Sequence, residues 1–168
     1  MPAIAFAREY LCEPMDDVSS LFPSTILQLA KDSTLKIIDR EVGDPDDQYF
    51  VGWDPAISSD RAADFTVMVV LRRPSTNPEL LELVHAVRRK NMDFRTQIME
   101  IQRINAKFNP DVIELEANNF QRVFATELRA DTDLPIKTFI LTRQRREYLL
   151  MGLVLRFENE QWRLPWGE

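Results

Sequence analysis

Two acidic residues stand where apolar runs end, and their side chains could hold a divalent metal ion. Asp54 follows the run YFVGW (residues 49–53), and Glu116 closes the run DVIELE (residues 111–116). If these runs form neighbouring parallel strands, both carboxylates emerge at the same sheet edge, about 4.8 Å apart from strand to strand. They could then share one ion or bracket two ions about 3.5–4 Å apart. Mg²⁺ and Mn²⁺ prefer such oxygen ligands, and the expected chemistry is hydrolysis of a phosphodiester bond.

Both acids also have purely structural interpretations, which the sequence leaves open. The dipeptide Asp54-Pro55 is a common way to begin a turn after a strand. Glu116 could be an exposed acid at a strand end, with Asn118 capping the helix that follows. A charged residue that closes an apolar strand tilts the balance slightly toward a functional role for Glu116.

Three further acids lie close to this pair in the sequence. Asp64 opens the next β-rich run and could face the same site, whereas Asp60 is better explained as a loop acid. Glu114 alternates with Glu116 and should share its face, either supporting the site or lying at an edge. Asp64 is therefore the third candidate ligand, after Asp54 and Glu116.

The basic residues are clustered. The net charge of −6 by itself argues against a dedicated nucleic-acid binder, but phosphates are neutralised by local groups of Lys and Arg. One group is RRK at residues 88–90, and the other contains Arg143, Arg145 and Arg146 between a predicted strand and a predicted helix. The second group could contact DNA phosphates, although a solvated start of a helix explains such groups more often.

Residue counts argue against several other kinds of site. The chain has one histidine, His85, and one cysteine, Cys12, which argues against a zinc site or a Ser-His-Asp triad. His85 alternates with apolar residues and is better explained as a packed strand histidine than as a ligand. The four glycines form no phosphate-binding or dinucleotide-binding loop, so we expect neither an ATPase nor a Rossmann site. No apolar run approaches the roughly 20 residues that cross a bilayer, and no targeting segment is visible.

The pattern along the chain predicts one mixed α/β domain. Three β-rich runs separated by turn-forming residues predict an antiparallel meander. Apolar residues at helical spacing then alternate with short strands, which predicts helical crossovers between parallel strands. In chain order, the expected elements are strands at 49–53, 65–71 and 80–87, a helix at 94–108, a strand at 112–115, a helix with Phe120, Val123, Phe124 and Leu128, a strand at 135–141 and a helix at 145–155.

Several motifs, in order, resemble the nuclease domain of the terminase large subunit of tailed phages and prophages. YFVGWDPAISSDRAADFTVMVVL (residues 49–71) resembles its opening, where a strand ends in a catalytic Asp followed by Pro-Ala and a later Asp-aromatic-Thr. VIELEANNFQ (112–121) resembles its second acidic strand. FAREYLCEP (6–14) resembles the junction after the packaging ATPase, and LRFENEQWRLPW (155–166) resembles a late hairpin. The similarity spans nearly the whole chain.

The resemblance implies an RNase H-like fold, similar to RuvC-type resolvases. The expected sheet is mixed and five-stranded: a three-strand antiparallel meander followed by two parallel strands, with flanking helices. Asp54 and Glu116 would be the first and second catalytic metal ligands, and Asp64 matches a frequently acidic accessory position. The implied activity is a Mg²⁺- or Mn²⁺-dependent endonuclease that cuts concatemeric double-stranded DNA during packaging.

The resemblance also implies partners and a location. The expected partners are double-stranded DNA and, in the full assembly, the portal protein and the small terminase subunit, with no membrane involved. The expected location is the cytoplasm of the bacterial host, at the procapsid during packaging.

The sequence departs from the family's pattern near its end. Members carry a third acid on a helix after the late hairpin, a position that neither Glu158 nor Glu160 matches before the sequence stops at Glu168. We therefore expect residues 1–30 to be a lead-in segment from the ATPase junction, and residues 31–168 to be a nuclease domain that lacks its C-terminal helix with the third acid. Two alternatives stay open: a non-catalytic RNase H-like fragment that binds DNA or the portal, and a related resolvase-type nuclease.

Overall fold

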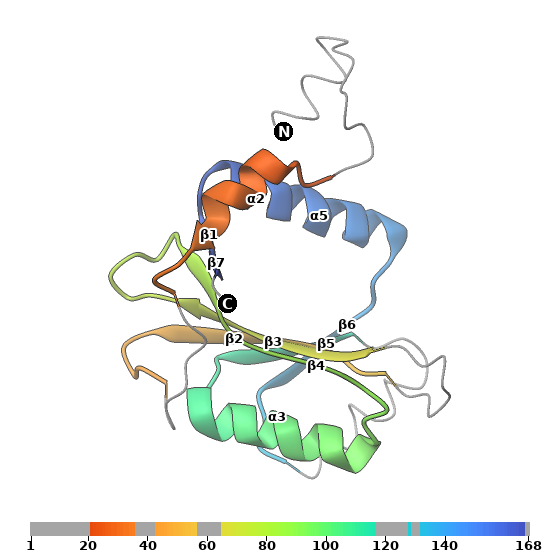
Figure 1. Cartoon of the computed structure of the whole chain (residues 1–168). Coiled ribbons are helices and arrows are strands. Elements are labelled where there is room, and N and C mark those ends of the chain that lie inside the picture. Colours follow the sequence, from red (N-terminus) through yellow and green to blue (C-terminus); the bar gives the residue numbers. More distant parts are fainter. Residues whose placement is uncertain (1–20, 36–42, 57–64, 117–127, 129–131, 167–168) are drawn as a thin grey trace.

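One mixed sheet organises the part of the chain that the structure describes. A computed structural model describes residues 21–35, 43–56, 65–116, 128 and 132–166. The sheet has seven strands in the order β1-β7-β4-β3-β2-β5-β6. Helix α3 lies against one face of the sheet, and helices α2 and α5 lie on the other side (Figure 1). The predicted mixed α/β fold with flanking helices is confirmed.

Strands β2 (Gln48–Asp54), β3 (Phe65–Arg73) and β4 (Leu81–Lys90) form the predicted antiparallel meander. In β2 and most of β3, buried side chains alternate with more exposed ones, because successive side chains of a strand point to opposite faces. Because the strands are antiparallel, the end of β2 lies beside the beginning of β3, and the beginning of β3 lies beside the end of β4.

Helix α3 (Phe94–Phe108) covers one face of this meander. Asp93 caps its first turn by accepting a hydrogen bond from the Thr96 amide, and Asn109 ends it in a left-handed conformation at φ 46°. The buried side chains at helical spacing on α3 pack against alternate side chains of the strands. The core contains Tyr49, Val51, Trp53, Met68, Val70, Ile101, Ile104, Phe108, Ile113 and Leu115.

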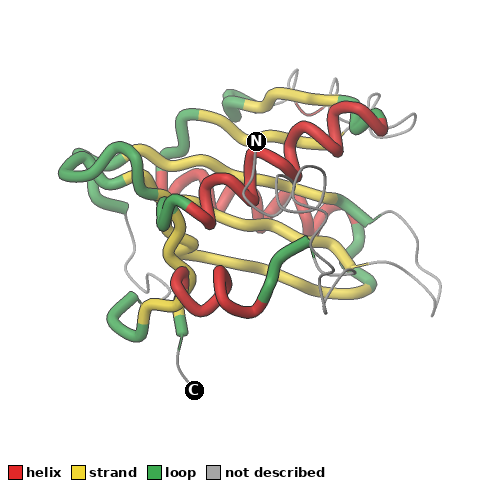
Figure 2. Tube along the Cα trace, turned by 90° about the horizontal axis from the view of Figure 1, so that it is seen from above, coloured by secondary structure: helices red, strands yellow, loops and turns green. Residues whose placement is uncertain are grey.

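Two parallel strands extend the sheet on the β2 side, as predicted. Strand β5 (Val112–Glu116) pairs with β2, and β6 (Ile136–Phe139) pairs with β5, both in parallel. The helix predicted between them lies outside the described residues except for Leu128, which is helical and buried. In the view from above, the strands lie side by side (Figure 2).

The predicted number of five strands is wrong, because two short strands extend the sheet on the β4 side. Strand β7 (Trp162–Pro165) pairs in parallel with β4 and with β1 (Lys31–Asp32). The expected late hairpin at residues 155–166 is also wrong, since that segment contains the end of a helix followed by β7. Strands of two and four residues are too short to show an alternating pattern, so only their tertiary pairing reveals them.

Helices α2 (Ser24–Ala30) and α5 (Arg143–Glu158) pack together beyond the other face of the sheet. Phe157 of α5 contacts Phe22 edge-on, with ring centroids 5.5 Å apart, and stacks on Trp162 at 5.6 Å. These ring contacts connect the C-terminal end of α5 to β7 and to the segment that precedes α2. Among the described helices, none is long and apolar enough to span a membrane.

Candidate metal and DNA site

Asp54 and Glu116 end neighbouring parallel strands, at the same edge of the sheet. The last paired residues of β2 and β5 are Trp53 and Leu115, and the two acids follow them by one residue in each strand. The geometric part of the prediction is therefore confirmed. Their roles as metal ligands and catalytic residues stay predictions.

Strand alternation directs both acids away from α3. Trp53 and Leu115, which precede them, are buried in the core beneath α3 at 2% and 0% exposure. Successive side chains point to opposite faces, so Asp54 and Glu116 face the side on which α5 lies. Asp54 is exposed and Glu116 is half-buried, so a metal ion and its water ligands have access to this edge.

A buried amide on α3 holds the backbone on both sides of Asp54. The side chain of Gln97 is fully buried, and its Oε1 accepts a hydrogen bond from Nε1 of Trp53 at 3.4 Å. Its Nε2 donates to the carbonyl oxygens of Ala56 (2.8 Å) and Met92 (2.9 Å). Gln97 therefore connects the residues that flank Asp54-Pro55 to the rigid helix.

The buried hydroxyl of Thr66 adds a second support at the same turn. Its Oγ1 accepts a hydrogen bond from the Ala56 amide at 3.2 Å. The backbone after Asp54 is thus held through both its N–H and its C=O group, by β3 and α3 respectively. Sequence reasoning missed Gln97, although a polar residue at helical spacing with Ile101 and Ile104 was a usable signal.

The other predicted acids are only partly placed. Glu114 is half-buried and stands beside Gly52 of β2 and Lys137 of β6, one alternation before Glu116. It therefore shares the face of Glu116 but lies further inside the sheet. Asp60 and Asp64 lie outside the described residues. Within the described ranges, no three His, Cys, Asp or Glu side chains group closely enough to hold a metal.

The fold brings one arginine of the second basic group close to this edge. The guanidinium carbon of Arg145 lies 5.2 Å from the ring centroid of Phe139, which stands beside Glu116 in the β5–β6 register. Arg143 is less available because its Nε is 3.0 Å from Oε1 of Glu147 in the same helix. The amide of Arg145 donates to Oγ1 of Thr142, so the group does start a capped helix. Arg146 is exposed on the same first turn.

His85 is a packed histidine, as its sequence context predicts. Its ring lies 5.7 Å from that of Phe108, and no described residue hydrogen-bonds to its buried Nδ1. Burial lowers the pKa of His85 below its ordinary value of 6.5, and the positive charge of Lys107 lowers it further. The imidazole is therefore neutral at pH 7.

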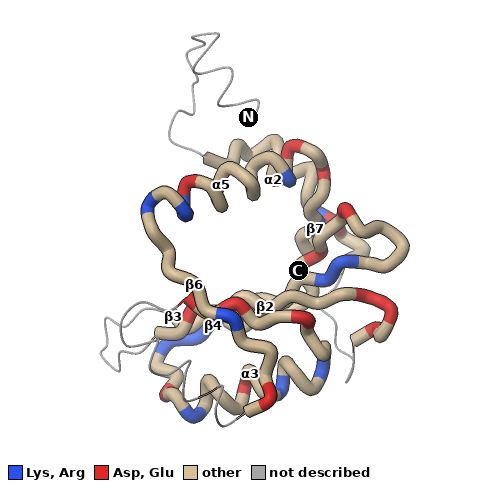
Figure 3. Tube along the Cα trace, turned by 180° about the vertical axis from the view of Figure 1, so that it is seen from behind, with Lys and Arg blue, Asp and Glu red and all other residues tan. Residues whose placement is uncertain are grey.

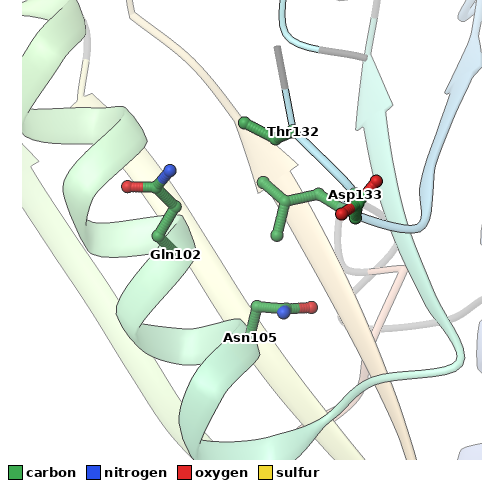
Figure 4. Close-up of a pocket in the computed structure, with 5 residues that line it drawn as sticks. Gln102, Asn105, Thr132 and Asp133 are labelled. Carbon is green, nitrogen blue, oxygen red and sulfur yellow. The ribbon is translucent and has the colours of Figure 1, made fainter. Parts of the chain in front are cut away.

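A separate pocket lies between α3 and the segment that precedes β6. Its volume is about 380 Å³. Figure 4 shows its lining: Gln102, Asn105, Thr132, Asp133 and Leu134. Because β6 begins beside Ile113, at the start of β5, this pocket is at the opposite end of β5 from Glu116. It is therefore distinct from the carboxylate edge.

Solved structures share this fold. The large terminase nuclease from thermophilic phage G20c with bound magnesium superposes with a TM-score of 0.69 at 18% identity, over 90% of this chain and 76% of that one. Its zinc-bound structure gives 0.68 at 18% identity, over 88% and 81%. The bacteriophage HK97 large terminase gives 0.55 at 12% identity, over 87% of this chain and 34% of that one. No protein-family model and no curated protein matches the sequence. The chain therefore has the fold of a large terminase nuclease domain.

Proposed function

We propose that this chain is a divalent-metal-dependent DNA endonuclease domain that cuts double-stranded DNA during viral genome packaging. One observation carries the proposal: Asp54 and Glu116 end adjacent parallel strands and point to the same side of the sheet. The structurally similar G20c nuclease was crystallised with magnesium, zinc and cobalt, which supports the use of a divalent metal.

The donor set suits a hard cation. Carboxylate oxygens at an exposed strand edge match the ligands that Mg²⁺ and Mn²⁺ prefer, and the half-buried position of Glu116 reduces competition from water. When bound, the metal supplies an activated water and stabilises charge on the phosphate. We assign Asp64 as a third ligand on the basis of the sequence resemblance alone.

The residues of the chain itself position the reaction. Gln97 and Thr66 hold the turn after Asp54, so the backbone that carries this carboxylate is already fixed before DNA binds. Arg145, over Phe139, faces the phosphates of the bound strand from the β6 side. The proposal has three further parts. The substrate is concatemeric DNA, the partners are the portal protein and the small terminase subunit, and the location is the host cytoplasm.

Nicking of supercoiled plasmid DNA in Mg²⁺ and in Mn²⁺ tests this function. Asp54→Ala and Glu116→Ala are expected to abolish nicking in both metals. Asp111→Asn is the matched control, because this exposed acid precedes the same strand as Glu116 at its opposite end. Nicking that survives both alanine substitutions would contradict the assignment.

A non-catalytic DNA-binding or portal-binding module is the second candidate. The exposed Arg145 over Phe139 favours it, because contacts to DNA phosphates need no metal. A resolvase-type nuclease would share the two carboxylates. Wild-type protein that binds DNA without nicking it in either metal would support the binding module, and nicking confined to branched DNA would support the resolvase.

A further inference from the structure

The register of the meander places two basic residues on the face that carries the carboxylates. Val67 of β3 stands opposite both Asp54 of β2 and Arg88 of β4, so the three residues form one row across the sheet. Lys90 stands opposite Phe65, two residues further along. Because directly opposite residues of antiparallel strands share a face, Arg88 and Lys90 face the same side as Asp54.

Phe65 supports both cations. The guanidinium carbon of Arg88 lies 3.3 Å from its ring centroid, and Nζ of Lys90 lies 4.8 Å from it. Both basic side chains are exposed, and no carboxylate in the described part of the chain lies within ion-pair distance of either. A guanidinium stacked on a ring keeps its N–H edge available for a phosphate. Phe65 therefore orients Arg88, and among the described residues no carboxylate neutralises it.

Arg145 flanks the carboxylates from the other side. It lies over Phe139 of β6, which is opposite Glu116 of β5. Asp54 and Glu116 therefore lie between two cations, each supported by an aromatic ring. With strands about 4.8 Å apart, the backbone of Arg88 is about 10 Å from that of Asp54.

We propose that Arg88 and Lys90, held on Phe65, bind backbone phosphates of double-stranded DNA on the β4 side of the carboxylates. The inference rests on the proposed nuclease function and adds the contacts that align the DNA strand across Asp54 and Glu116. Contacts to phosphate position DNA without reading its sequence. They also matter more than the net charge of −6, because binding depends on local cations.

Binding of a short fluorescent DNA duplex, measured in EDTA between about 50 and 200 mM salt, tests this inference. The double substitution Arg88→Gln/Lys90→Gln is expected to weaken binding at least roughly tenfold and to lower the slope of log affinity against log salt by about 1–2. Arg88→Lys, which keeps the charge, should retain the slope. Thermal melting checks that each variant is folded.

Arg73→Gln is the matched control. Arg73 lies 5.3 Å from the ring centroid of Phe50, at the opposite end of the same face, and donates a hydrogen bond to Gln48. This substitution is expected to leave affinity and slope unchanged. Three results would overturn the inference. The double variant and Arg73→Gln could change binding equally, the double variant could keep the wild-type slope, or the wild-type protein could fail to bind the duplex.

The assay separates this inference from the proposed function, because binding in EDTA needs no cutting. If the wild-type protein binds DNA through Arg88 and Lys90 but never nicks it, the nuclease proposal is refuted and the proposed phosphate contacts stand. If the double variant nicks DNA and binds it with wild-type affinity and salt slope, the nuclease proposal stands and the proposed phosphate contacts are refuted.

Discussion

The two ends of the β2–β3–β4 meander carry similar residue types in opposite electrostatic states. At one end, Nε of Arg72 is 2.7 Å from Oε2 of Glu82, and its Nη1 is 3.6 Å from Oδ2 of Asp47. At the other end, Arg88 and Lys90 lie over Phe65, and the described residues provide no carboxylate for them. Figure 3 shows basic residues at both ends of the sheet.

This difference separates a structural end from a binding end. A cation matched by a carboxylate of its own chain is already compensated, whereas one held only by an aromatic ring can still bind an external anion. The acids differ in their surroundings: Asp47 accepts a hydrogen bond from the Ser75 amide at 2.9 Å, whereas Asp54 lies beside a second acid, Glu116, at an exposed edge of the sheet. In the proposed function, the binding end of the sheet is the one that holds both the metal and the DNA phosphates.

The largest expected effect comes from exchanging an acid for its amide at each end of β2. Asp54→Asn should weaken Mn²⁺ binding by more than the roughly 10–100-fold that loss of an outer partner of a metal site costs. Asp47→Asn should leave Mn²⁺ binding unchanged. Isothermal titration with Mn²⁺ measures both, and equal affinities in the two variants would remove the distinction between the ends.

The next largest effect is expected from Gln97→Leu, which removes the buried amide behind the binding end. Trp53 Nε1 and the carbonyl of Met92 then lose their partner, at a cost of about 1–3 kcal/mol in the free energy of unfolding. Nicking should fall as well, because the turn after Asp54 loses its connection to α3. Gln102→Leu, on the exposed face of the same helix, is the control for urea unfolding. A Gln97→Leu variant as stable as this control would show that the amide does not support the turn.

A smaller change in stability separates the two ends by unfolding alone. Arg72→Gln leaves the nearly buried Glu82 without its charged partner and should cost about 1–2 kcal/mol, since the Arg72 side chain keeps 22% exposure. Arg88→Gln removes no ion pair formed with a described residue, so its urea midpoint should match the wild type. The reverse order of the two midpoints would mean that the Phe65 contact is structural.

The smallest effect concerns pH and His85, which lies between the two ends. Burial lowers its folded-state pKa below 6.5, so the unfolded chain binds this proton more readily than the folded protein. Its contribution makes the protein lose stability as pH falls below about 6.5, until the folded-state pKa is reached. Urea unfolding of wild type and His85→Asn between pH 7 and 5 measures the difference. Parallel curves would show that the packed imidazole does not titrate differently on folding.

Local pattern predicted most of the elements and placed each of the two carboxylates at the end of a strand. The β-rich runs at residues 49–53 and 65–71 predicted β2 and β3, and apolar spacing of three and four predicted α3. Asp54 and Glu116 were identifiable because each is a charged residue that ends an apolar strand. Gln97 was not identified, since the value of a buried amide depends on the groups it meets, which come from 41 and 44 residues away.

The sequence by itself therefore determined whether each long segment forms a strand or a helix, and which kind of residue stands at its ends. Only the tertiary structure decided that β5 lies beside β2, that β1 and β7 extend the sheet, and that Arg88 shares a row with Asp54. The physical reason is range. A period of two or of 3.6 residues is produced by neighbours along the chain, whereas strand order and register depend on hydrogen bonds between segments far apart in sequence. The distance between Asp54 and Arg88 is set by that register.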